Sequence, residues 1–150
     1  MYLRALGGYR CSVAKRMPGY SGTPLPKKLG IKDGFHFVLI DAPPDVITEL
    51  KPSLKKCTSS NDGKTAIDFA MLFTKSAASL KKEFAKIARN LSPAGMLWIS
   101  WPKKTSGVAT DLNENIVRET GLAAGLVDVK VCAVTDVWSG LKFVRRLKDR

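Results

Sequence analysis

The sequence predicts one α/β domain of the Rossmann-like, three-layer class, with a mostly parallel sheet and an antiparallel C-terminal strand. Short apolar segments rich in β-branched and aromatic residues alternate with segments whose apolar residues recur every three or four positions, so strands alternate with helices. The order of the segments is β-α-β-β-α-β-α-β-β. The last two strand segments, 126–134 and 141–147, follow each other across a short link, which predicts a hairpin and an antiparallel last strand.

Proline and glycine mark the first elements of the domain. Pro24 or Pro26 opens a one-turn helix that ends at Gly30, because proline suits the first turn of a helix. Residues 35–40 form the first strand, since they are mainly β-branched and aromatic. A short helix then begins at proline 43 or 44 and reaches residue 50, and a second short strand covers 54–58.

The middle of the chain predicts the core of the sheet. Residues 66–74 are apolar except for Asp68, which is typical of a central parallel strand buried on both faces. Ser76 caps the helix that follows. Residues 93–95 end that helix, and 96–101 form the next strand. The helix presents one apolar stripe to the core, formed by Ala77, Leu80, Phe84, Ile87 and Leu91.

A further helix follows the strand 96–101. Asp111 is its expected N-cap, with Glu114 three residues later in the spacing of a capping box. The helix runs to Thr120, and Gly121 closes it.

The last strand, 141–147, carries apolar and basic residues in alternation. We expect it to insert between two neighbouring strands and to run antiparallel to 126–134. Its Arg145 and Arg146 are then expected to point to solvent at the margin of the sheet.

Basic residues dominate the charge of the chain, whose formal net charge is +12. The first 32 residues contain seven lysines and arginines and no acidic residue. Such a positive field attracts nucleic acid, phosphorylated metabolites or an acidic membrane surface, although a simple basic surface has the same composition. We expect residues 1–18 to be a flexible basic extension, with Met17 an alternative start, and 19–150 to be the domain.

Cysteine and histidine are too few for a metal site of the common kinds. The chain has Cys11, Cys57 and Cys132, without a Cys-x-x-Cys pair, and His36 is its single histidine. Unpaired cysteines favour a reducing cytoplasm. No apolar run approaches the roughly 18–20 residues of a membrane span.

The strongest candidate site is the loop 103–111, which follows the strand 96–101. Ligands of open α/β sheets bind beyond the carboxyl ends of the strands. This loop supplies two charges, two hydroxyl donors and a glycine that allows close backbone approach, a set that suits an anion. The candidate ligand-binding residues are Lys103, Lys104, Thr105, Ser106 and Gly107, together with Asp41 and Trp101 at the ends of two strands.

The turn after the first strand does not resemble a phosphate-binding loop. It reads Asp41-Ala42-Pro43-Pro44 and has no glycine, and its two prolines lack amide donors. Asp41 could accept a ribose hydroxyl or an amine, or it could cap the next helix. With one histidine, no Ser-His-Asp set can be assembled, and the carboxylates show no paired spacing typical of acid–base chemistry.

Three stretches resemble a bacterial family of small proteins of unknown function. They are GYSGTPL with KKLGI (19–31), WPKK through SG to TDL (101–112), and the tail from GL at 121 to WSGLKF at 138–143. The resemblance covers 19–150 and implies a bacterial, cytoplasmic protein. It implies no activity, no cofactor and no catalytic residue.

A second likeness is to the later half of class I methyltransferases. It rests on the segment 67–73, a helix, and the segment 91–99, and on the antiparallel closing strand. The chain departs from these enzymes at the first strand, where their glycine loop is missing.

Three functional hypotheses follow. The leading one is non-catalytic binding of an anionic small ligand or partner at the loop 103–111. The second is a basic accessory protein of nucleic acid. The third is a divergent methyltransferase-like enzyme, which a narrow pocket between Asp41 and Trp101 would favour.

Overall fold

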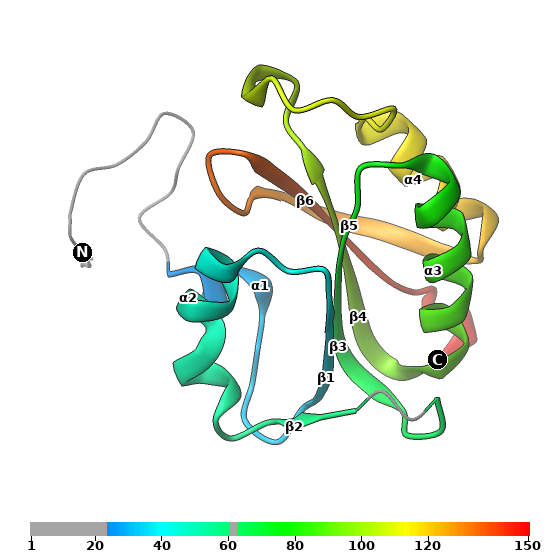
Figure 1. The fold of residues 1–150 in the computed structure, drawn as a ribbon. Helices are drawn as coiled ribbons and strands as arrows, with labels where there is room; N and C mark the ends of the chain where they lie inside the picture. The colour runs from blue at the N-terminus through cyan, green and yellow to red at the C-terminus, as the bar shows by residue number, and fades with distance from the viewer. Residues whose placement is uncertain (1–23, 61–62) are drawn as a thin grey trace.

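The computed structural model describes residues 24–60 and 63–150, so the predicted extension 1–18 lies outside the described residues. One six-stranded sheet lies between two helical layers, with α1 and α2 on one face and α3 and α4 on the other (Figure 1). The elements are α1 (Leu25–Leu29), β1 (His36–Ile40), α2 (Pro44–Leu54), β2 (Thr58–Ser59), β3 (Ile67–Phe73), α3 (Ala77–Asn90), β4 (Leu91–Pro102), α4 (Glu114–Ala123), β5 (Leu126–Ala133) and β6 (Trp138–Arg145).

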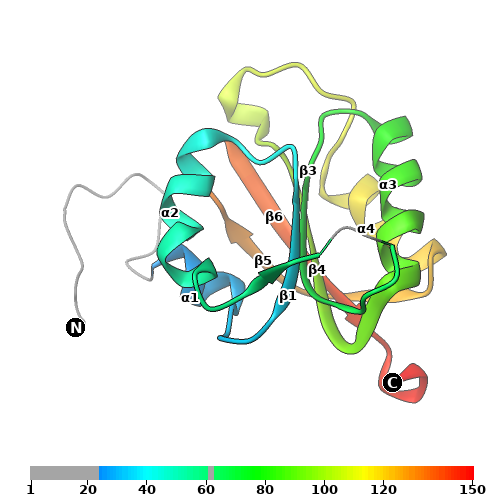
Figure 2. The same ribbon diagram turned by 60° about the horizontal axis from the view of Figure 1, so that its bottom comes forward.

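The strand order is β2-β1-β3-β4-β6-β5. The strands β2, β1, β3 and β4 pair in parallel, and β6 runs antiparallel to both β4 and β5. The predicted fold class is therefore confirmed, and so is the insertion of the last strand between two neighbours. Strand β2 lies at one edge of the sheet beside β1, and Figure 2 shows the two helical layers on opposite sides of the sheet.

Asp68, the polar residue in the buried strand β3, joins the amino ends of three strands. Its carboxylate accepts from the amide of His36 at 2.9 Å and from the hydroxyl of Ser92 at 3.1 Å. The ring of His36 lies 3.6 Å from the same carboxylate. Two side-chain partners and one amide thus satisfy a charge that would be costly without them.

Each face of the sheet has its own apolar core. On the α3/α4 face, Phe84 and Phe143 pack edge to face with their ring centroids 5.3 Å apart. A Cβ at Gly121 would overlap the Phe143 ring, so α4 approaches the sheet closely there because it has no side chain. On the α1/α2 face, Trp98 is fully buried and its indole donates to the carbonyl of Leu29 at 3.0 Å, which ties α1 to the sheet.

The second predicted strand is wrong in its bounds. Helix α2 continues to Leu54, and β2 covers only Thr58–Ser59. Val46 and Leu50 are buried in the α1/α2 core and Leu54 packs against it, so one apolar face extends the helix past the predicted end.

The predicted cap of α4 is also wrong. Asn113 is the cap, and its side-chain oxygen accepts from the amide of Ile116 at 2.9 Å. The carboxylate of Asp111 instead accepts from the amide of Ala77 at 2.8 Å, in the first turn of α3. Ser76 caps α3 as predicted, through the amide of Ser79.

Arg145 does not point to solvent as expected. Its guanidinium donates to the carbonyls of Ala88 and Leu91, at 2.6–3.1 Å, at the C-terminal end of α3. A cation is favourable at that end of a helix, where carbonyls lack partners. No described helix is long and apolar enough to cross a membrane.

Candidate functional site

The carboxyl ends of β1 and β3 form the switch point of the sheet. From β1 the chain continues outward to β2, whereas from β3 it continues in the opposite direction to β4. Crevices at such points are where open α/β sheets bind ligands. Asp41 follows β1 directly, is exposed, and has a φ of 58°. This conformation is uncommon outside glycine, although aspartate tolerates it better than most residues.

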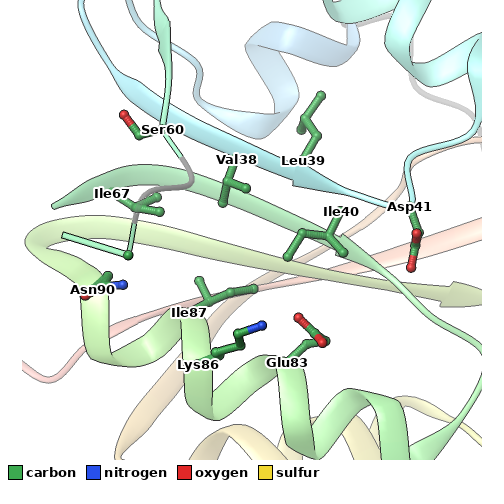
Figure 3. Close-up of a pocket in the computed structure, with 11 residues that line it drawn as sticks. Val38, Leu39, Ile40, Asp41, Ser60, Ile67, Glu83, Lys86, Ile87 and Asn90 are labelled. Carbon is green, nitrogen blue, oxygen red and sulfur yellow. The ribbon is translucent and has the colours of Figure 1, made fainter. Parts of the chain in front are cut away.

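A groove of about 480 Å³ begins at Asp41 and runs between β1 and α3. This size falls in the range of about 300–1,000 Å³ typical of ligand pockets. Figure 3 shows side chains of β1 above and of α3 below, with Asp41 at the end of the strand. Its apolar walls are Val38, Ile40, Ile67 and Ile87, and its polar groups are Asp41, Ser60, Glu83, Lys86 and Asn90.

The groove exists because α3 does not cover β1. Helix α3 packs over β3 and β4. Val38 and Ile40, which face the same side, therefore remain half-buried at the edge of the α3/α4 core.

The charges around the groove favour a neutral or cationic ligand. Asp41 and Glu83 contribute two carboxylates, and Lys86 contributes one ammonium. Asn90 and Ser60 add neutral hydrogen-bonding groups. A strongly anionic ligand would meet an excess of negative charge here.

The turn into α2 offers few amide donors to a ligand. Pro43 and Pro44 have none, and the helix begins with the acidic Asp45 in its first turn. The amide of Ile47 already donates to the carbonyl of Pro43. The turn is therefore a poorer cradle for a carboxylate or phosphate than a glycine loop.

The predicted loop 103–111 is folded by its own polar groups. The hydroxyl of Ser106 donates to the carbonyl of Lys103 at 2.7 Å and accepts from the amide of Val108 at 3.2 Å. Gly107 ends the 3₁₀ turn Lys104–Ser106 with a φ of 77°. Lys104 and Thr105 are exposed, and Lys103 is half-buried. The ligand role of these residues stays a prediction.

Trp101 and Asp41 do not share the groove. Trp101 is 5% exposed and belongs to the α3/α4 core, and it does not line the groove. Of the two strand-end candidates, only Asp41 reaches the groove.

The sequence analysis missed the α3 side of the groove. Glu83, Lys86 and Asn90 are three and four residues apart, so they lie along one side of the helix. The signal in the sequence was Glu83, the single acidic residue among the basic residues of this helix. The sequence analysis considered only the apolar stripe of the helix.

Comparisons with known proteins identify the fold. No family model matches the sequence, so its resemblance to a bacterial family of unknown function stays a prediction. No curated protein matches it either. Among solved structures, the chain is similar to the magnesium protoporphyrin IX methyltransferase of Synechocystis PCC 6803 with bound S-adenosylmethionine (SAM), at a TM-score of 0.54 and 11% identity. The match covers 81% of this chain and 74% of that one.

Two further structures have the same fold. A SAM-dependent methyltransferase from Aquifex aeolicus matches at a TM-score of 0.53 and 15% identity, over 79% of this chain and 86% of that one. A pericyclic reaction enzyme matches at 0.53 and 14% identity, over 83% of this chain and 47% of that one, so the chain spans about half its length. The predicted likeness to class I methyltransferases is therefore confirmed for the fold.

Proposed function

We propose that this methyltransferase-fold domain binds a small molecule of the nucleoside class in the groove between β1 and α3. The observation that carries the proposal is the position of the groove, which starts at Asp41 on the switch point of the sheet. A nucleoside joins a flat apolar ring to hydroxyl and amino groups. The apolar walls Val38, Ile67 and Ile87 suit the ring, and Asp41 and Asn90 suit the polar groups.

SAM, which the fold neighbours suggest, does not fit this site at its amino-acid end. The carboxylate of SAM needs donors, and the turn after β1 places Pro43 and Pro44 where amides are required. The nearby carboxylates of Asp41 and Asp45 would repel that carboxylate, whereas they would attract the sulfonium and ammonium groups of SAM. We therefore derive no methyl-transfer step, and the proposal is binding without catalysis.

Calorimetric titration with adenosine and SAM tests both parts of this proposal. Adenosine should bind, and SAM should bind with a similar dissociation constant, because the carboxylate of its methionine end gains no donors and its repulsion offsets the attraction of the sulfonium and ammonium groups. If SAM binds more than about tenfold tighter than adenosine, a difference of roughly 1.4 kcal/mol, the fit argument is wrong.

A pair of matched variants locates the site. Asp41→Asn removes a carboxylate from the groove, and asparagine tolerates the same positive φ. It should weaken adenosine about tenfold or more, as expected for a hydrogen bond to a charged group. Asp45→Asn removes the same charge four residues away and outside the groove, and it should leave the affinity unchanged. Equal losses in both variants, or no binding by the unaltered protein, would overturn the proposal.

A second candidate function is the predicted binding of an anionic ligand near the loop 103–111. One observation favours it: the amide of Lys103 donates to the carbonyl of Val137 at 2.7 Å, which holds the loop beside the β5–β6 link, where Lys103 lowers the pKa of Lys28. The loop thus contributes to a larger group of lysines on the α1/α2 face.

A further inference from the structure

Four lysines from four segments converge on the α1/α2 face of the sheet. Lys130 of β5 and Lys142 of β6 are direct partners across the strands. Lys28 comes from α1, and Lys103 from the loop after β4. We name Lys28, Lys103, Lys130 and Lys142 the lysine cluster.

Hydrogen bonds hold two members of the lysine cluster in place. Lys28 is only 9% exposed, and its ammonium donates to the carbonyl of Ala133 at 2.8 Å. The ammonium of Lys130 donates in turn to the carbonyl of Lys28 at 3.1 Å. Lys142 reaches the same part of the face, because its ammonium lies beside Gly30 at the C-terminal end of α1.

The positive charges of the lysine cluster lower the pKa values of their neighbours. Burial lowers the pKa of Lys28 below its ordinary value, and Lys103 and Lys130 lower it further. The pKa of Lys142 is also lowered, first by burial and then by Lys130 and Lys32. Like charges directly opposite across two strands destabilise a sheet.

The described chain provides little negative charge against these lysines. Within residues 24–60 and 63–150, Lys103, Lys130 and Lys142 form no ion pair with a carboxylate. Glu49 of α2 acts on Lys28 and raises the pKa of that ammonium, so the cluster has one carboxylate near it in the described part of the chain. The pKa of the Cys132 thiol is raised by burial, so it stays neutral at pH 7. Residues 1–23 contain no acid at all.

We propose that the lysine cluster binds a compact anion with phosphate groups, as carried by a phosphorylated small molecule. The anion would supply the negative charge that Lys103, Lys130 and Lys142 do not find among the described residues. Charged hydrogen bonds from several ammonium groups suit phosphate oxygens. Hydrogen bonds link Lys28 to β5 and Lys130 to α1, and Lys142 lies beside Gly30 at the end of α1, so the cluster occupies one part of the face and fits a compact ligand better than a nucleic-acid strand. The proposal develops the second candidate function and does not depend on the groove.

Calorimetric titration of the full chain with pyrophosphate, at physiological ionic strength, tests the proposal. The double variant Lys103→Ala/Lys142→Ala removes two charges without touching the bonds that hold α1. It should weaken pyrophosphate binding about tenfold or more, as expected for charged hydrogen bonds. The control Lys81→Ala/Lys82→Ala removes two exposed charges from α3, on the other face, and should change the affinity less than about twofold.

Adenosine binding to the same variants separates this proposal from the previous one. The groove variants should bind pyrophosphate normally, and the lysine-cluster variants should bind adenosine normally. Equal weakening of pyrophosphate by both lysine pairs would show a general charge effect and overturn the proposal. So would a 20-nucleotide single strand that binds under conditions where pyrophosphate does not, since that result assigns the lysines to nucleic acid.

Discussion

The sheet has two open corners, and they lie on opposite faces. On the α3/α4 face the opening lies over β1, where Val38 and Ile40 are half-buried and Asp41 and Glu83 bring negative charge. On the α1/α2 face the second corner is the surface of the lysine cluster beside β5 and β6, where Lys130 is exposed and Lys142 is half-buried. Between these corners both faces are filled by apolar side chains.

The contrast in charge shows how one sheet can offer two different sites. The polar side chains of the two corners come from different elements, β1 and α3 at one and α1, β5 and β6 at the other. An acidic corner selects hydroxyl and amino groups, and a basic corner selects phosphate. The filled regions provide stability, and the open corners provide the polar surfaces.

The largest loss of stability should come from a cavity in the apolar core. Phe143→Ala removes a fully buried ring that packs against Phe84, and it should cost about 3–5 kcal/mol of unfolding free energy. Val38→Ala in the open corner removes a half-buried side chain and should cost less than about 1.5 kcal/mol. Urea unfolding measures both. Similar losses at the two positions would show that the groove is closed in solution.

A smaller effect should follow from releasing α1. Trp98→Phe keeps the aromatic ring but removes the donor to the carbonyl of Leu29. The orphaned carbonyl should cost about 1–3 kcal/mol. Thermal unfolding with near-ultraviolet circular dichroism measures the loss, and an unchanged midpoint would mean that α1 is held by other contacts.

The backbone at the acidic corner gives a third test. Asp41→Val places a β-branched residue at a φ of 58° and should cost about 1–3 kcal/mol. Asp41→Asn should cost less than about 0.5 kcal/mol, because asparagine accepts this conformation and the side chain is exposed. Chemical unfolding of both variants distinguishes them, and equal stability would contradict the positive φ.

The smallest effect concerns the basic corner. Lys142→Met removes one charge from the cross-strand pair with Lys130 and should raise stability at pH 7 by up to about 1 kcal/mol. The pKa of Lys142 is lowered in the folded protein, so its charge opposes folding below that pKa. The penalty disappears as pH rises toward the ordinary value of 10.5, and the advantage of the variant should shrink accordingly.

Unfolding curves between pH 7 and pH 10.5 check this prediction. Lys81→Met, on the exposed side of α3, is the matched control and should show no such trend. A stability advantage of Lys142→Met that grows with pH would contradict the sign of the pKa shift.

The sequence by itself determined the fold class and most elements, because their signals are local. A helix repeats its apolar residues every three or four positions, so the core stripe with Leu80, Phe84 and Ile87 is visible before folding. The cap at Ser76 is equally local, since its partner lies three residues away. The insertion of β6 followed from the likeness to class I methyltransferases, and the short link to β5 predicted the hairpin.

Tertiary structure alone decided the sites and the long-range caps. The sequence predicted Asp111 as the cap of the helix that follows it. In the structure its carboxylate instead accepts from the amide of Ala77 in α3, a residue 34 positions earlier in the chain. The acidic groove exists because α3 packs over β3 and β4 and leaves β1 uncovered. The position of a helix over a sheet cannot be predicted from the residues of the helix or of one strand alone. The lysine pair needs the exact pairing of β5 with β6, and an irregularity between Asp128 and Lys130 shifts that register. A shift of one residue in a strand exchanges the faces of its side chains, so the charge of a sheet corner is settled only when the strands pair.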